Sequence, residues 1–172
     1  MAQTYTISSF GTTFAANKCM LGIYNGSGSG RVVRVYRIVM LNNQITAVTG
    51  AVTNLEIRRT SAGSGGTDIT PFKHDSTNES FPSQIIVSTN MTITATDVLT
   101  KVIWSTDEPA INSLTIDEFE TLPAFSTIWD SGYGDSNTEP IVLREGYGVA
   151  LVNIGATTGI ADVFFYVTLE SS

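Results

Sequence analysis

The spacing of apolar residues constrains the fold of this chain most strongly, because it almost never recurs with the 3.6-residue period of a helix. Short apolar or alternating runs are bounded by Gly, Pro, Asn, Asp or Ser, a pattern typical of sandwiches and barrels built from strands. These runs predict strands at Tyr5–Ser9, Cys19–Tyr24, Val32–Leu41, Val52–Arg59, Gln84–Ser88, Val98–Ser105, Ser113–Leu122, Pro140–Leu143, Gly148–Ile154 and Ala161–Glu170.

The expected fold class is therefore all-β: a single-domain β-sandwich over residues 1–172, preferably a jelly roll, with an immunoglobulin-like sandwich as the alternative. The first ten residues, 1–10, are expected either to be ordered or to form an arm onto a neighbour. Two runs, VRVYRIVML (33–41) and ADVFFYVTL (161–169), are apolar at consecutive positions. Such runs predict burial on both faces, between two sheets or against another subunit.

The stretch NGSGSG (25–30) raises the question of a phosphate cradle or a catalytic serine. A phosphate loop needs a lysine after its last glycine and a helix whose N-terminus faces the anion, but Arg31 and β-branched valines follow here. A nucleophile elbow needs serine at its centre, where this stretch has Gly28. We therefore expect a connection between strands, in which Ser27 and Ser29 tolerate alanine because such a surface turn buries no side chain.

A second stretch, SAGSGG (61–66), is expected to be another loop between strands. The long polar segment that follows it, residues 67–83, contains prolines and is expected to run over the surface.

Few residues could support catalysis. His74 is the only histidine and has no serine or oxyanion motif near it, and Cys19 lies among apolar residues as a core cysteine would. We expect no enzyme, no cofactor and no zinc site. In IDEFE (116–120), strand alternation would place Glu118 and Glu120 together on one face, which is expected to face solvent. Whether DSGYGDSNTE (130–139) binds calcium is left open.

The charges are few and unevenly distributed. Only 15% of the residues are charged, against about 25% in ordinary globular domains. Residues 1–96 carry seven basic and four acidic groups, a net +3, whereas residues 97–172 carry two and twelve, a net −10. Such a chain is poorly suited to nucleic acid, and it shows neither a signal peptide nor an apolar span. We therefore expect no nucleic-acid or membrane partner, and synthesis in a cytoplasm.

Five of the nine basic residues are arginines in two strand-like runs: Arg31, Arg34, Arg37, Arg58 and Arg59. Strand alternation would place Arg34 on the opposite face from Arg31 and Arg37. Arginine is favoured in ion pairs between subunits, so these five are candidate interface residues. Pairing with acidic groups of the same chain, or a solvated edge that prevents aggregation, is the alternative.

Three stretches, NGSGSGRVVRVYRIVMLNNQ, TPFKHDSTNES and IWDSGYGDSNTEPIVLREGYGVALVNIG, resemble small jelly-roll virion proteins of tailed bacteriophages, of the capsid decoration or cement type. The resemblance is one of character and carries over no functional residue. It implies a non-enzymatic structural protein of the virion, made in the host cytoplasm, that forms a homotrimer and binds the major capsid protein to stabilise the shell.

Two other functions stay open at this stage. A head-fibre, tail-fibre or baseplate component would also be an all-β virion protein. A carbohydrate-binding module would use exposed aromatic rings, for which Trp104, Trp129, Tyr133 and Tyr147 are candidates, although Trp104 lies in a strand-like run expected to be core.

Overall fold

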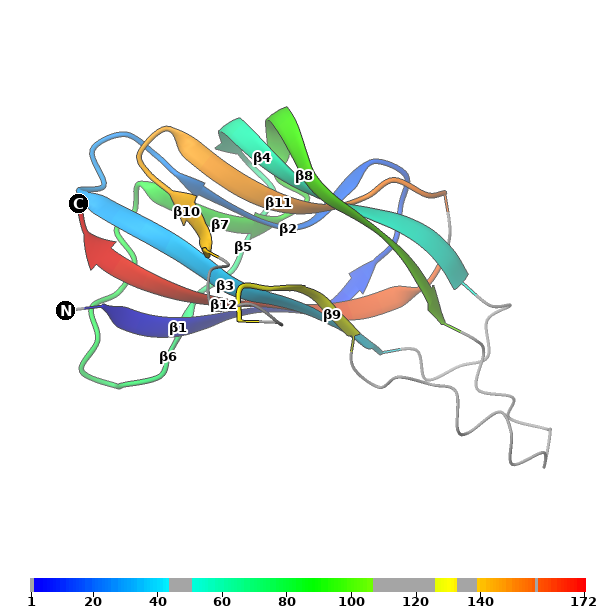
Figure 1. Cartoon of the computed structure of the whole chain (residues 1–172), viewed down its shortest axis with the longest axis horizontal. Coiled ribbons are helices and arrows are strands. Elements are labelled where there is room, and N and C mark those ends of the chain that lie inside the picture. The colour runs from blue at the N-terminus through cyan, green and yellow to red at the C-terminus, as the bar shows by residue number, and fades with distance from the viewer. Residues whose placement is uncertain (1, 44–50, 107–125, 133–138, 157) are drawn as a thin grey trace.

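The computed structural model describes residues 2–43, 51–106, 126–132, 139–156 and 158–172. They form two antiparallel six-stranded sheets packed face to face, without a helix in these ranges (Figure 1). The strands are β1 (Gln3–Thr13), β2 (Lys18–Asn25), β3 (Arg31–Asn42), β4 (Ala51–Ser64), β5 (Thr67–Asp68), β6 (Phe72–Lys73), β7 (Ile85–Thr89), β8 (Thr92–Thr106), β9 (Ser126–Asp130), β10 (Ile141–Leu143), β11 (Tyr147–Asn153) and β12 (Ile160–Ser171). The predicted all-β class and β-sandwich are confirmed.

The pairing of strands is nested along the chain. One sheet, sheet A, has the order β10-β3-β12-β1-β6, with β9 also paired to β3; the other, sheet B, has the order β5-β7-β2-β11-β4-β8. The first strand therefore pairs with the last, β2 with β11, β3 with β10 and β4 with β8. The first residues, left open between an arm and an ordered segment, belong to β1 from Gln3 onward. Both termini lie at the same end of the sandwich (Figure 1).

The main core lies between the sheets and is supplied by alternate residues of the strands. In β12 these are Val163, Phe165, Val167 and Leu169, all at most 2% exposed. The intervening Phe164 and Tyr166 point to the other face of sheet A and are half-buried. The continuous apolar run in β12 thus has one fully buried face and one partly exposed face.

Sheet B has a second, smaller apolar cluster on its outer face. Cys19, Ala150 and Val152 are buried there beneath Met91. The fit is close, because a Cβ atom on Gly63 would lie 2.6 Å from Met91 Sδ. Gly63 therefore lies in this strand because there is no room for a side chain, and β2 and β11 are buried on both faces.

The structure corrects several predicted boundaries. Residues 61–64 of the predicted loop SAGSGG belong to β4, and only Gly65 and Gly66, both at positive φ, make the turn. Segment 67–83 contains the short strands β5 and β6 and passes from sheet B to sheet A. Strand β8 begins at Thr92 rather than Val98, and β9 was not predicted. The strand predicted at Ser113–Leu122 and the IDEFE carboxylates lie outside the described residues.

Replacing Phe165 by alanine is expected to reduce the free energy of unfolding by about 3–5 kcal/mol, because its ring is completely buried between the sheets. Urea denaturation followed by tryptophan fluorescence measures the loss. Phe72→Ala is the matched control: Phe72 is 55% exposed, so its removal should change stability by less than about 0.5 kcal/mol. Equal losses in the two variants would contradict the inward position of Phe165.

Candidate functional site

Four of the five candidate interface arginines form ion pairs within their own chain. These pairs are Arg31–Glu79, Arg34–Glu170 at 2.9 Å, Arg37–Asp130 at 2.9 Å and Arg58–Glu56 at 2.7 Å. The pairs of Arg34 and Arg37 join the basic N-terminal part to the acidic C-terminal part. Some of the opposite charges of the two halves therefore pair within the chain, because β3 lies between acidic residues of β12 and β9.

The predicted alternation of these arginines along β3 is wrong at one position. Val35 pairs with Val167 and Arg37 with Tyr166, so Tyr36 is an extra residue, a β-bulge. The bulge reverses the alternation after it. Arg34 and Arg37 therefore share the outer face of sheet A instead of lying on opposite faces.

Arg58 belongs to a charge cluster on sheet B. The carboxylate of Glu56, whose side chain is 7% exposed, lies 2.7 Å from both Arg58 Nη2 and Lys101 Nζ. Hydrogen bonds from Lys101 and, to a smaller extent, from Arg58 lower the pKa of Glu56. This cluster connects β4 to β8, so its role in the structure is to join two strands.

The glycine–serine stretch forms an anion cradle whose anion comes from the same chain. The backbone N–H groups of Gly28 and Gly30 donate to the two carboxylate oxygens of Glu145, at 3.1 and 2.7 Å. Both glycines have positive φ, which lets the two amides point toward one carboxylate. These hydrogen bonds lower the pKa of Glu145. The loop is therefore a connection between strands, as predicted, and it binds the turn between β10 and β11.

The two serines of this loop differ from each other. Ser27 is exposed, as expected, but the side chain of Ser29 is buried, and its Oγ accepts a hydrogen bond from the Arg31 amide at 3.2 Å. The expectation that the turn buries no side chain is therefore wrong for Ser29. The hydroxyl completes the turn, because it faces the backbone of the next strand.

The turn held by Glu145 carries two residues of a polar pocket, which we call the arginine pocket. It has a volume of about 480 Å³ and is lined by Arg34, Arg59, Glu139, Val142, Arg144 and Tyr147. Arg59 Nη1 donates to the Val142 carbonyl oxygen at 3.3 Å, and Tyr147 is 49% exposed. Three arginines from three segments far apart in sequence thus line one pocket.

Sequence reasoning found only part of this pocket. Arg34 and Arg59 were predicted as interface residues, and Tyr147 as an exposed aromatic, but Arg144 was not singled out. The signal available for Arg144 was its position in REGYG, a turn before a strand-like run. Trp104 is buried in the core, as predicted, at 5% exposure.

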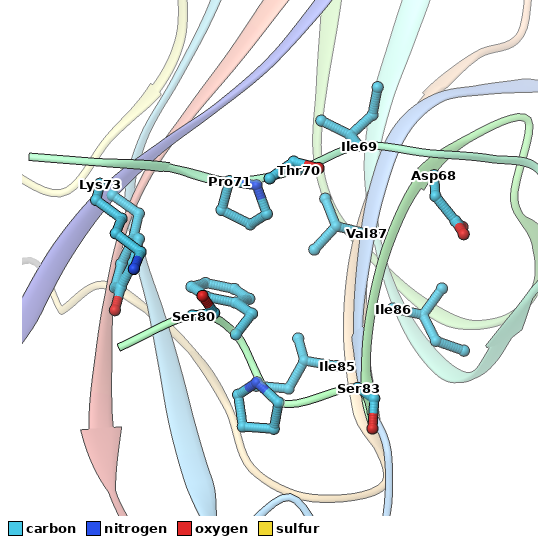
Figure 2. A pocket seen from close by; sticks show the side chains of 13 residues that line it. Asp68, Ile69, Thr70, Pro71, Lys73, Ser80, Ser83, Ile85, Ile86 and Val87 are labelled. Atoms are coloured by element: carbon cyan, nitrogen blue, oxygen red, sulfur yellow. The ribbon is translucent and has the colours of Figure 1, made fainter. Parts of the chain in front are cut away.

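A second pocket, of about 400 Å³, lies at the seam between β1 and β6 of sheet A and β5 and β7 of sheet B. Figure 2 shows Pro71 and Ile69 on one side, and Ser80 and Ser83 on the facing segment. The ring of Tyr5 packs edge-on against Phe81 with centroids 4.8 Å apart.

The ionisable groups of this seam pocket do not form a catalytic pair. Lys73 and Asp68 lie at opposite sides of it (Figure 2). The hydroxyl of Tyr5 lies 2.6 Å from the Glu79 carbonyl oxygen, and burial raises the pKa of Tyr5. The lining combines apolar residues from both sheets with the polar side chains of Thr70, Ser80 and Ser83.

The remaining chemical candidates are placed as follows. His74 Nε2 lies 2.7 Å from Thr6 Oγ1, in an exposed position where β6 pairs with β1. Cys19 is buried, and desolvation raises its pKa to about 12, so the thiol stays protonated at neutral pH. Among the described residues, no three His, Cys, Asp or Glu side chains come together as a metal site would require. The calcium hypothesis for 130–139 depends on residues 133–138, which lie outside the described ranges.

Comparison with known proteins adds no relative. No family model matches the chain, and neither a curated protein nor a solved structure gives a match. In the part of the chain that the structure describes, no helix has the length and apolar character needed to cross a membrane.

The clamp between Glu145 and the glycine loop can be tested by pH titration. The pKa of Glu145, measured by NMR, is expected below the ordinary glutamate value, because the Gly28 and Gly30 amides stabilise the charged form. Since the folded pKa is the lower one, the stabilisation is present above the unfolded pKa and is lost as the pH falls through the folded pKa. The Gly28 and Gly30 amide shifts should titrate together with Glu145.

The matched variants are Glu145→Gln, which should abolish this titration of the loop amides, and Glu139→Gln, which should leave it unchanged. If the chemical shifts of the Gly28 and Gly30 amides do not change with pH in the unmodified protein, the Glu145 carboxylate does not bind them in solution.

Proposed function

We propose that this protein is a non-enzymatic structural protein of a bacteriophage virion, a jelly-roll sandwich that decorates and stabilises the capsid as a homotrimer. The nested pairing of β1 with β12, β2 with β11, β3 with β10 and β4 with β8 supports a jelly roll over the immunoglobulin-like alternative. The resemblance in character to decoration proteins supplies the virion context. The observation that carries a structural role is a long strand edge that no other described strand covers.

Strand β8 is the long edge of sheet B. Among the described strands, the other sheet ends are β5 and β6, with two residues each, β10, with three, and β9, with five. The β6 strand pairs with only two residues of β1. Short edge strands protect a sheet from pairing with another chain, whereas β8 has fifteen residues. Its bulges at Thr96 and Leu99 interrupt the ladder without covering it. No described strand therefore pairs with the outer side of β8 in sheet B.

The side chains of this edge have the character of a subunit contact. Ile103 is 74% exposed, Val98 46% and Leu99 37%. The outward charge between them, Lys101, is already paired with Glu56. The core of a stable interface is depleted of charge, and a typical contact buries about 800 Å² on each partner. We assign the β8 edge to contact with a second copy of this chain, which a ring of three copies repeats around its axis.

The oligomer prediction is tested by light scattering after size exclusion. The unmodified protein should have a mass three times the 18.4 kDa of a single chain, and the Ile103→Asp variant should have the mass of a single chain. The melting temperature of the monomeric variant should reflect loss of the contact alone, because Ile103 is mostly exposed within the subunit. Phe72→Asp, an exposed position on sheet A, is the control and should stay trimeric.

A mass of 18.4 kDa for the unmodified protein at micromolar concentration would contradict a preformed trimer. If the Ile103→Asp variant is still a trimer, the contact between copies does not depend on β8.

The virion role is tested by mixing the protein with empty phage shells and imaging them. We expect density at local three-fold or quasi-three-fold positions of the shell. Trimers held by apolar contacts should persist in 1 M salt, where the Debye length falls to about 3 Å, whereas attachment through arginines should weaken. Density confined to five-fold vertices or to the tail would favour a fibre or baseplate component instead.

A further inference from the structure

The arginine pocket has hydrogen-bond donors in excess of the acceptors around it. Each guanidinium offers five N–H donors. Within the described residues, Arg34 uses its Nε on Glu170, and Arg59 uses one Nη1 on the Val142 carbonyl oxygen. Arg144 has no ion-pair partner among these residues. The pocket can therefore bind a further acceptor group without breaking the contacts it already has.

The acceptor that suits this arrangement is a planar anion. The rigid fork of arginine matches a carboxylate bidentately, and such charge-assisted bonds are stronger than neutral ones. Asp97 lies opposite Arg59 in the β4–β8 register, but the two side chains form no ion pair. The positive charge of Arg59 and Arg144 is thus directed to the pocket rather than to a neighbouring strand.

Two further lining side chains, Tyr147 and Glu139, restrict the ligand. Tyr147 presents a half-exposed ring, on which an apolar ring face can pack. Glu139 brings a carboxylate to the same pocket, which would repel a simple anion but can accept hydrogen bonds from hydroxyl groups. A ligand that fits all three features carries a carboxylate, a ring with an apolar face, and hydroxyl donors.

We propose that the arginine pocket binds a carboxylate-bearing sugar, a uronic acid residue of an acidic polysaccharide. Arg59 and Arg144 bind the carboxylate, Tyr147 packs against the sugar ring, and Glu139 accepts from its hydroxyls. The pocket's volume of about 480 Å³ lies within the ordinary range of small-ligand sites. This activity goes beyond the proposed structural role, because neither a trimer nor capsid attachment requires it.

The turn between β10 and β11 holds two residues of this pocket in place. Arg144 and Tyr147 flank Glu145, whose carboxylate is held by Gly28 and Gly30. The Tyr147 amide also donates to the Arg144 carbonyl oxygen at 3.1 Å, which closes the turn. Glu145 is therefore a positioning residue, since it fixes the turn without lining the pocket.

The experiment is an NMR titration of the full-length ¹⁵N-labelled protein with D-galacturonate and D-glucuronate. At least one uronate should shift the amides of Arg59, Arg144 and Tyr147 in a saturable way. D-galactose, D-glucose, acetate and inorganic phosphate are the comparison ligands, and each should bind at least roughly tenfold more weakly, since it lacks the carboxylate or the sugar ring.

Two substitutions and two matched controls locate the site. Arg144→Gln and Tyr147→Ala should each weaken uronate binding roughly tenfold. Arg37→Gln removes an arginine of another ion pair, and Phe72→Ala removes an exposed ring of β6 that does not line the pocket, so both should bind as the unmodified protein does. Unchanged melting temperatures confirm that the four variants are folded.

Four results would overturn the proposal. These are no saturable shift with either uronate, equal binding of acetate or phosphate at the same residues, unchanged binding in both pocket variants, and tighter binding of N-acetyl-glutamate N-methylamide than of a uronate. The last result would assign the pocket to a protein carboxylate. None of these outcomes bears on the mass of the oligomer or on its position on a shell, so the structural role is tested separately.

Discussion

The pairing of the last strand with the first and the third holds sheet A together. Strand β12 lies between β1 and β3, with Phe165 opposite Ile7 on one side and Ile38 on the other. All these contacts join residues far apart in the sequence, so the loop-closure entropy of most of the chain opposes their formation. A sheet of this kind forms slowly compared with local structure, and it is incomplete until the C-terminal residues are present.

The same constraint explains which parts of the fold could be predicted from the sequence. Runs such as Val32–Leu41 and Ala161–Glu170 alternate or are continuously apolar because they are buried in the sandwich, and that signal is local. The bulge at Tyr36 is not local. It arises from the register between β3 and β12, so the faces of Arg34 and Arg37 could not be derived from one strand alone.

Glycine gave the most ambiguous signal in the sequence. In SAGSGG, Gly65 and Gly66 make a turn, whereas Gly63 leaves room for Met91 on the outer face of sheet B. Both uses are physically sound, but only the three-dimensional neighbour distinguishes them. In NGSGSG, the lack of a following lysine and helix argued for a connection between strands, yet the carboxylate that the loop binds, Glu145, lies 115 positions from Gly30. No local pattern could have supplied it.

The distribution of charge favours short-range recognition at the arginine pocket. The chain carries a net charge of −7, so its overall field repels an approaching anion. At physiological ionic strength this field is screened beyond about 8 Å, and inside that distance the nearest groups dominate. Several basic side chains are already neutralised by carboxylates, whereas Arg59 and Arg144 meet in one hollow beside Tyr147. A ligand there gains little from long-range steering and must be held by directional hydrogen bonds and ring contact. That requirement favours a ligand with several contact groups over a bare ion. Tyr147 and Glu139 therefore contribute to the specificity of the proposed site as much as its arginines do.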